Sequence, residues 1–453
     1  MTGAIPPEAA GIPSGCTGRR GDQPSVPEDG DSRERGSGAG GLLAEMDVAS
    51  GGPLQGVRVL DLSRIVAAPF ATMALGDLGA TVIKVERPGA GDDCRAWGPP
   101  FMEGESAYFL AVNRNKKGMA VDFATEEGRR AVRRLALEWA DVVVDNFKDG
   151  TLERWGLGLA DLRRDNPRLV TASVRGYPEG DARPGYDFIT QASSGLMSLN
   201  GPPDGDFYKV GAPISDLSSG LFLLSGILAA LFHREQYGTG QHVSVSLWES
   251  QVSLLVNANQ SYLTSHRTPR RMGNAHPQVA PYEVYKTKDA PVAIAGGNQA
   301  QFARIANALG HPEWVDDPAF ATNSDRVANR ADLAARIEEA LASRTRDEVL
   351  AALTALDVPC GALRSIDEVF SSPEAAAAGI VVKVPHRLLG EVPVVRLPWR
   401  FSATPAAPRF GSPTLGQDTD AILTSLAATD SVATSGPGSD APSDLVPRAP
   451  DKT

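Results

Sequence analysis

One short segment combines a carboxylate with aromatic and small neighbours in a way that could do chemistry. Asp187 lies between Tyr186 and Phe188, and small residues ending in Gly195 follow it. A carboxylate in this setting is either the N-cap of a helix that begins at Phe188, because Asp is a favoured N-cap, or a nucleophile poised in an apolar pocket. The residues alone leave both interpretations open.

Basic residues in loops after predicted strands form a second group of candidates. Loops at the carboxyl ends of strands form the ligand site of open α/β sheets. Arginine suits bidentate binding of phosphate, and backbone N–H groups at helix N-termini add to it. These side chains either gather on one face of the sheet or are solvated surface charges; they are Arg64, Arg87, Lys116, Lys117 and Arg154.

Other common catalytic arrangements are missing from the sequence. It has no HExxH, P-loop, GxSxG or Cys–His–Asp constellation, and its 6 histidines are scattered. The 3 cysteines (Cys16, Cys94 and Cys360) are far apart, so neither a disulfide framework nor a cysteine zinc site is expected. No G-x-G-x-x-G follows the first predicted strand, so the dinucleotide cofactor of an oxidoreductase is not indicated.

Alternating strands and helices must position these candidates. Short, nearly continuous apolar runs are typical of parallel strands buried on both faces, and helical segments separate them. Repeated βαβ units predict an α/β fold with a Rossmann-like, doubly wound sheet. The predicted strands are residues 57–62, 81–86, 141–146, 169–174 and 242–247, and a long apolar helix is expected over 213–234.

Composition divides the chain into unequal parts. Residues 1–50 and 428–453 are rich in Gly, Pro, Ser and charge, and such segments cannot bury enough apolar surface to order themselves. Both are predicted to be disordered. Between them we expect a large domain over 53–265, a linker over 266–280, a smaller α+β domain over 281–375 and a return to the large domain over 376–425.

Charge and hydropathy limit the partners. The formal net charge of this 453-residue chain is −11, which argues against broad nucleic-acid binding. No apolar run reaches the ~18 residues that would span a bilayer, and the N-terminus lacks a secretory signal pattern. The sequence therefore predicts a cytoplasmic protein with no nucleic-acid or membrane partner.

Several segments together resemble the class III CoA-transferases, which include the formyl-CoA:oxalate and carnitine enzymes and, by common fold, the α-methylacyl-CoA racemases. The resemblance covers residues 54–423 and looks closest to the succinate–hydroxymethylglutarate branch. The segments are DLSRIVAAPFATMALGDLGATVIKVERPGAGDDCRAWGPPF, VNRNKKG, DNFKDGTLERWGLG, GYDFITQASSGLM and LGQDT.

This resemblance implies a fold, a partner and a chemistry. Members have a Rossmann-like domain and a smaller domain, and two chains interlock like links of a ring in a homodimer. Asp187 matches the family's catalytic aspartate, which would form an acyl anhydride and then a thioester with CoA. The substrates would be an acyl-CoA, such as a dicarboxylyl-CoA, and a small carboxylic acid, with no permanently bound cofactor. By position, CoA would contact Arg64, Ile65, Val66, Ala67, Arg87, Asn146, Phe147, Arg154 and Arg175.

Two alternatives to transfer remain. Racemases of the family have His before the aspartate and a second carboxylate that Asp216 matches; here the preceding residue is Tyr186, and a phenol is a poor base near neutral pH. A non-catalytic CoA-binding protein could dispense with Asp187.

Two features of the linker bear on substrates. A dicarboxylate needs a cation near its free end, for which Arg270 and Arg271 are candidates. We also find no multi-glycine loop of the kind that shields intermediates in the formyl-CoA enzyme; Met272–His276 is the candidate replacement.

Overall fold

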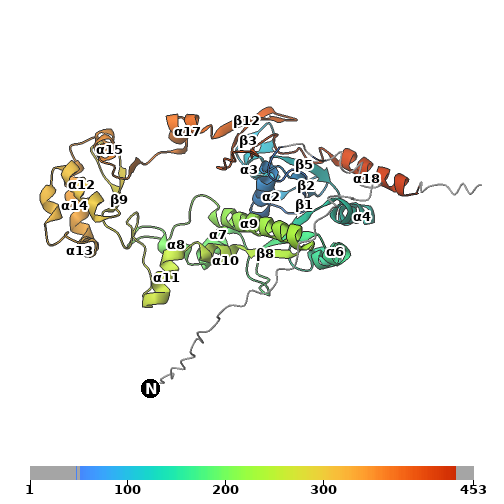
Figure 1. Ribbon diagram of the computed structural model, residues 1–453, viewed down its shortest axis with the longest axis horizontal. Coiled ribbons are helices and arrows are strands. Elements are labelled where there is room, and N and C mark those ends of the chain that lie inside the picture. Colours follow the sequence, from blue (N-terminus) through green and yellow to red (C-terminus); the bar gives the residue numbers. More distant parts are fainter. Residues whose placement is uncertain (1–46, 48–50, 435–453) are drawn as a thin grey trace, which may run out of the picture.

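The computed structural model describes residue 47 and residues 51–434, and its centre is a six-stranded parallel sheet (Figure 1). The strand order is β5-β2-β1-β6-β7-β8, and every neighbouring pair is parallel. This confirms the predicted α/β fold with a parallel central sheet. The strands are β1 (Arg58–Asp61), β2 (Thr81–Glu86), β5 (Lys116–Ala120), β6 (Val142–Asp145), β7 (Val170–Arg175) and β8 (His242–Ser246).

Helices cover both faces of the sheet, as the continuous apolar strands require. Val59 and Leu60 illustrate the alternation, because Val59 belongs to one hydrophobic core and Leu60 to the other. The first core includes helices α2 (Ala67–Asp77), α9 (Ile214–Tyr237) and α10 (Leu247–Ser253). The second includes α4 (Glu126–Arg134), the π-helical turn Leu135–Trp139, α6 (Leu159–Asp165) and α18 (Thr419–Thr434).

Strand β5 was not predicted, because its sequence KKGMA looks like a loop. In the structure it pairs with β2 at the edge of the sheet, and Lys116 is fully buried. The Nζ of Lys116 lies 2.9 Å from a carboxylate oxygen of Asp61 and also donates to Asn113 Oδ1. The proposal that Lys116 joins a phosphate-binding group is therefore wrong for this residue, since its charge is used inside the core.

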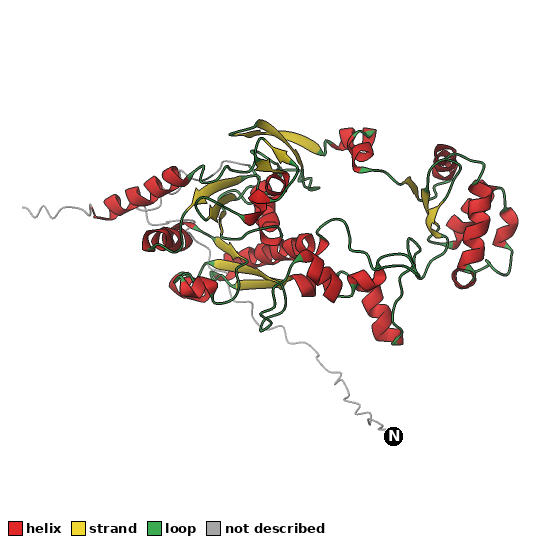
Figure 2. Ribbon diagram, turned by 180° about the vertical axis from the view of Figure 1, so that it is seen from behind, coloured by secondary structure: helices red, strands yellow, loops and turns green. Residues whose placement is uncertain are grey.

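A second unit has its own hydrophobic core, which residues 280–358 supply. Three antiparallel strands lie in the order β11-β10-β9 with helices packed beside them. The two views show this unit apart from the central sheet and joined to it by two stretches of chain (Figure 2). Its elements are β9 (Tyr282–Tyr285), β10 (Val292–Ala295), α12 (Gln299–Leu309), the 3-10 turn Pro312–Val315, α13 (Asn323–Ala328), α14 (Arg330–Leu341), α15 (Arg346–Ala355) and β11 (Cys360–Ala362).

The chain then returns to the large unit. After α16 (Ile366–Phe370) and α17 (Pro373–Ala378), strands β12 (Val381–His386) and β13 (Gly390–Val395) form an antiparallel hairpin whose apolar side packs with Leu110. Helix α18 then packs near β5 and α4. The exact domain boundaries given above stay predictions.

Two sequence expectations need correction. Helix α9 is long and apolar enough to cross a membrane by length and composition. This was not predicted, because Ser and Gly interrupt its apolar residues. Within this structure α9 packs against α2, α10 and the sheet, as a core helix does.

The second expectation concerns the C-terminal tail. Helix α18 extends into the segment predicted to be disordered, because no Pro or Gly interrupts this stretch. The other residues of the two predicted disordered segments, apart from Asp47, lie outside the described residues.

Candidate active site

The candidate site lies where the strand order reverses, between β1 and β6. In doubly wound sheets this is the position at which ligands bind, beyond the carboxyl ends of the strands. Here the loop after β1 is fastened to Asn146, which follows β6. The Oδ1 of Asn146 accepts the N–H of Arg64 at 2.9 Å, and its Nδ2 donates to the carbonyl of Arg64 at 2.7 Å. One side chain thus fixes both peptide groups of Arg64.

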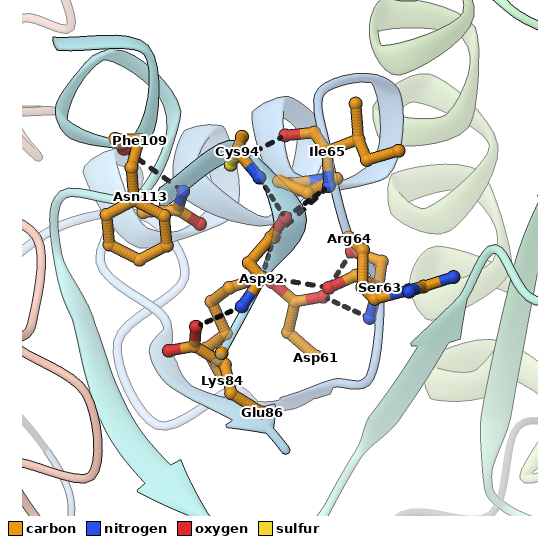
Figure 3. A network of polar contacts seen from close by, with 12 residues as sticks. Asp61, Ser63, Arg64, Ile65, Lys84, Glu86, Asp92, Cys94, Phe109 and Asn113 are labelled. Carbon is orange, nitrogen blue, oxygen red and sulfur yellow. Dashed lines mark hydrogen bonds and ion pairs between the residues drawn. The ribbon is translucent and has the colours of Figure 1, made fainter. Parts of the chain in front are cut away.

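The next residue, Ile65, has a backbone conformation that its side chain disfavours. Its φ is +72°, and a β-branched residue in this region is strained. Figure 3 shows how the surroundings hold it: both carboxylate oxygens of Asp92 accept the Ile65 N–H at 3.1 Å, and the Cys94 thiol faces its carbonyl at 3.8 Å. Because Val66 is the N-cap of α2, this loop sets where the helix begins.

A buried cluster of charges lies beneath the loop. Lys84 Nζ is 2.9 Å from Asp92 and donates to the Ser63 carbonyl at 2.8 Å, and the side chains of Lys84 and Asp92 are fully buried. Burial alone would raise the pKa of Asp61, but Lys116 and Lys84 beside it lower that pKa to about 2. Buried ion pairs, and not solvent, therefore support the underside of the loop.

A cavity of about 520 Å³ opens above this loop. Most of the residues that the resemblance assigned to CoA binding line this cavity, and so do Tyr186 and Asp216. The predicted residues that line it are Arg64, Ile65, Val66, Ala67, Asn146, Phe147 and Arg175.

Three of the predicted basic side chains are paired with carboxylates. Arg64 and Arg87 bind the two oxygens of Asp93, at 3.0 and 2.9 Å, and the Arg64 guanidinium lies 5.3 Å from the centre of the Phe147 ring. Arg175 pairs with Asp149 at 2.6 Å and with Asp145 at 3.3 Å.

Two predicted contacts are not among the residues that line this cavity. Arg87 is connected to it only through Asp93, which it shares with Arg64. Arg154 lies on the short helix α5 (Thr151–Arg154), is exposed and donates to the hydroxyl of Thr151 at 3.3 Å.

Asp187 is the first residue of helix α7 (Asp187–Ser193), and its N-cap is Tyr186. The interpretation of Asp187 as an N-cap is therefore wrong. Its Oδ1 instead accepts N–H groups from the start of α9, from Ser215 at 2.8 Å and from Asp216 at 3.4 Å. Its Oδ2 accepts the side-chain N–H of Gln191 at 2.7 Å. The carboxylate is half-buried and held from two elements.

The second carboxylate has unusual electrostatics. Burial and the neighbouring charge of Asp187 raise the pKa of Asp216 to about 7. Burial also raises the pKa of Tyr108, with Asp216 and Asp187 adding to the effect. Tyr108 belongs to helix α3 (Ala107–Val112), so a third segment of the chain faces the two carboxylates.

Two glycines let the segment before Asp187 approach β7. A Cβ added to Gly185 would lie 2.2 Å from the Cα of Gly176, closer than side chains tolerate. Only glycine at both positions allows this crossing of the two backbones, which brings Tyr186 and Asp187 to the carboxyl end of the sheet.

Sequence reasoning did not find the contacts of Gln191 and Ser215 with Asp187, or the position of Tyr108 near the two carboxylates. Gln191 has a weak sequence signal, a polar residue one turn after Asp187 on the same helix face. The other two come from distant segments, and only the tertiary fold brings them close. Within the described residues, no group of three or more His, Cys, Asp and Glu side chains could hold a metal ion.

The family model described as CoA-transferase family III matches residues 54–419. Since this is most of the sequence, the chain belongs to that family and is a transferase enzyme that uses CoA thioesters. The expectation from the sequence segments is confirmed at this level.

Individual relatives agree with this assignment. The chain is 41% identical over 382 residues to the succinyl-CoA:glutarate CoA-transferase of Mus musculus, covering 84% of this chain and 87% of that protein. It is also 41% identical over 392 residues to the succinate–glutarate CoA-transferase of Agrobacterium fabrum, covering 84% and 98%. A crystal structure of a CAIB/BAIF family protein from Brucella suis superposes with a TM-score of 0.74 at 42% identity, covering 83% of this chain and 99% of that one.

Proposed function

We propose that this enzyme moves CoA from a dicarboxylyl-CoA, such as succinyl-CoA, to an acceptor dicarboxylate through covalent intermediates on Asp187. The observation that carries the proposal is the Asp187 carboxylate, held by N–H groups of Ser215 and Gln191 beside the cavity at the sheet's switch point. A carboxylate fixed in this way is presented for attack on a thioester without further rearrangement.

The intermediates preserve the free energy of the thioester. Asp187 takes the acyl group as an anhydride, exchanges it for CoA as a thioester, and then passes CoA to the acceptor through a second anhydride. Either intermediate would be lost to water, so the site must exclude solvent. Met272–His276 is our candidate for that cover: Gly273 N donates to the Gly201 carbonyl at 3.1 Å, which joins this part of the linker to the 201–210 segment.

The CoA moiety occupies the cavity above the β1 loop. Arg64 and Arg175 line the cavity and would meet its phosphates, and Ile65 to Ala67 would contact its pantetheine arm or adenine. Arg87 and Arg154 would meet the phosphates where CoA extends beyond this lining. Arg64 and Arg87 share one carboxylate, Asp93, so the pair keeps a net positive charge that favours a phosphate. The enzyme would need no permanently bound cofactor and would act in the cytoplasm as a homodimer.

The names of the two relatives favour dicarboxylates as substrates, since both refer to succinate or succinyl-CoA and glutarate. A free second carboxylate needs a cation, and Arg271 is our candidate. Its guanidinium lies 4.2 Å from the centre of the Phe207 ring and donates to the carbonyls of Pro202 and Gly205. These contacts fix its position on the segment that leads to Val210, whose N–H binds Gln191.

One observation favours a second candidate activity, racemisation α to the thioester. Asp216 lines the cavity, and its pKa of about 7 would let it take and return a proton near neutral pH. CoA transfer remains our proposal, because the second base that a racemase needs would have to be Tyr186, and a phenol is a poor base near neutral pH.

A direct assay separates these activities. Wild type and Asp187→Asn are incubated with succinyl-CoA and either glutarate or a monocarboxylate, and the CoA esters are quantified. We expect wild type to form glutaryl-CoA and the variant to form it at a rate lower by roughly 10³-fold or more. The variant should still bind free CoA. Release of protons from the α-carbon into deuterated water, without any new CoA ester, would overturn the proposal in favour of racemisation.

A further inference from the structure

The two oxygens of Asp187 lie in different surroundings. Oδ1 faces two backbone N–H groups, of Ser215 at 2.8 Å and Asp216 at 3.4 Å. Oδ2 faces one side-chain amide, that of Gln191 at 2.7 Å. Nothing in an isolated carboxylate distinguishes its oxygens, so the protein imposes this difference.

The donors to Oδ1 are fixed in place. Ser215 and Asp216 belong to the first turn of α9, a helix of 24 residues, whose first N–H groups have no intrahelical partner and carry partial positive charge. The buried hydroxyl of Ser215 donates to Gln251 Oε1 at 2.8 Å, which anchors this turn to α10. Such preorganised donors stabilise an oxygen that becomes negatively charged during reaction.

The donor to Oδ2, the side-chain amide of Gln191, is also held in place, because it forms a second hydrogen bond. Gln191 is fully buried, and its Oε1 accepts the N–H of Val210 at 2.8 Å. This bond sets which end of the amide faces Asp187. A rotation of the carboxylate by half a turn would have to break the hydrogen bonds from both α9 and Gln191.

We propose that the oxygens of Asp187 have permanent and different roles. Oδ2 attacks the acyl carbon and departs with the acid, whereas Oδ1 stays in place and carries the negative charge of each tetrahedral intermediate that forms at Cγ of Asp187, held by the N–H groups of Ser215 and Asp216. This assignment rests on the covalent route given under Proposed function.

The first half of the reaction moves CoA from the donor to Asp187. An electron pair of Oδ2 forms a bond to the acyl carbon of the donor, and the C–S bond breaks to release the CoA thiolate. The thiolate sulfur then attacks Cγ of Asp187, the carbonyl pair moves onto Oδ1, and it returns as the Cγ–Oδ2 bond breaks. Oδ2 leaves as part of the donor carboxylate, and no proton is exchanged.

The second half replaces the lost oxygen. A carboxylate oxygen of the acceptor attacks Cγ, charge again collects on Oδ1, and the Cγ–S bond breaks. The thiolate then attacks the acceptor acyl carbon, and the bond from that carbon to the bridging oxygen breaks. The bridging oxygen stays on Asp187 in the Oδ2 position, so each turnover exchanges Oδ2 and retains Oδ1.

Labelling with oxygen-18 tests this directly. Wild-type enzyme is given succinyl-CoA and succinate labelled in all its carboxylate oxygens, and the peptide containing Asp187 is analysed by fragmentation mass spectrometry after increasing numbers of turnovers. We expect one heavy oxygen in Asp187 and no second one, however long the reaction runs. Two heavy oxygens would overturn the assignment. No heavy oxygen at all would instead refute the covalent route itself.

A pair of variants at one position tests the role of the N–H group. Ser215→Pro removes the N–H that faces Oδ1, and proline is tolerated in a first helical turn, whereas Ser215→Ala keeps the N–H and removes only the hydroxyl. We expect kcat of the proline variant to be about 10²–10³-fold below that of the alanine variant. Equal kcat values would contradict the role given to Ser215.

Gln191→Leu tests the lock on rotation, and its readout does not depend on the rate. Without the amide, the carboxylate can turn, and a second heavy oxygen should enter Asp187. A variant that is slower but still incorporates a single heavy oxygen would show that Gln191 has only a structural role.

Discussion

The direction of the Asp187 carboxylate depends on residues that are remote in sequence. The local pattern was ambiguous because Asp is both a good N-cap and a good nucleophile. The N-cap interpretation is wrong because Tyr186 takes the N-cap position, and Ser215, 28 residues later, offers its N–H to Oδ1. Sequence reasoning found the residue, but its orientation depends on how α7 packs against α9.

Asp216 should make stability depend on pH. Its pKa in the folded protein is about 7, above its ordinary value of 3.8, so its favourable contribution is complete below about pH 4 and is lost as pH rises to about 7. Asp216→Asn should therefore gain a few °C in Tm over wild type at about pH 8 and little at about pH 4. Thermal unfolding at both pH values measures this, with the exposed Asp206→Asn as control. A Tm difference that does not change with pH would contradict it.

Arg271 should determine the preference for dicarboxylates. Arg271→Ala is expected to raise KM for glutarate by at least about 10-fold, in keeping with the loss of a charge-assisted hydrogen bond, and to change KM for a monocarboxylate little. Steady-state kinetics with both acids measure this, and the exposed neighbour Arg270→Ala is the matched control. An equal effect on both acids would remove Arg271 from the acyl site.

The loop between β1 and α2 shows how an element prepares a site. Its peptide groups are bound by side chains from three other segments: Asn146 holds Arg64, Asp92 holds Ile65, and Lys84 holds the Ser63 carbonyl. This arrangement maintains a conformation that Ile65 would not adopt in a free chain. The strand and helix on either side were predicted, but the clamp was not, because its members are spread over more than 80 residues.

Asp92 should therefore affect both stability and CoA binding. Asp92→Asn leaves the buried Lys84 without its carboxylate, and loss of one partner of a buried pair costs about 3–5 kcal/mol. It also releases Ile65, so the Kd for free CoA measured by calorimetry should rise. Adding Ile65→Gly, which tolerates a positive φ, should restore much of the affinity.

Asp77→Asn is the matched control for that experiment. Asp77 forms a buried pair with Arg114 at 2.6 Å on the far end of α2, so its variant should lose stability without losing CoA affinity. If Asp92→Asn and Asp77→Asn behave alike towards CoA, the loop does not depend on the clamp.

Strand β5 is the strand of the central sheet that the sequence pattern did not predict. Apolar runs predicted the other five strands of the central sheet to within a residue or two. The two lysines and glycine of β5 indicated a loop, because the pairing of Lys116 with Asp61 depends on a contact 55 residues away in sequence.

At the scale of the whole molecule, exposed apolar side chains predict a homodimer. Tyr186 and Phe188, on either side of Asp187, are 55% and 53% exposed, and Val256 and Leu263 of α11 (Val256–Ser265) are 69% and 64% exposed. Apolar surface of this kind marks an interaction site. Sedimentation velocity at micromolar concentration should give twice the 47.7 kDa of one chain. A monomer that retains full activity would contradict this prediction.

CoA transfer is proposed to pass through a covalent intermediate on Asp187, and trapping that intermediate tests this most directly. Wild type and Asp187→Ala are mixed with succinyl-CoA, treated with hydroxylamine or borohydride, digested and analysed by mass spectrometry. We predict a hydroxamate or alcohol at Asp187 in wild type and neither product in the variant. Active wild-type enzyme that yields no product at Asp187, or a variant that transfers CoA at the wild-type rate, would contradict the account.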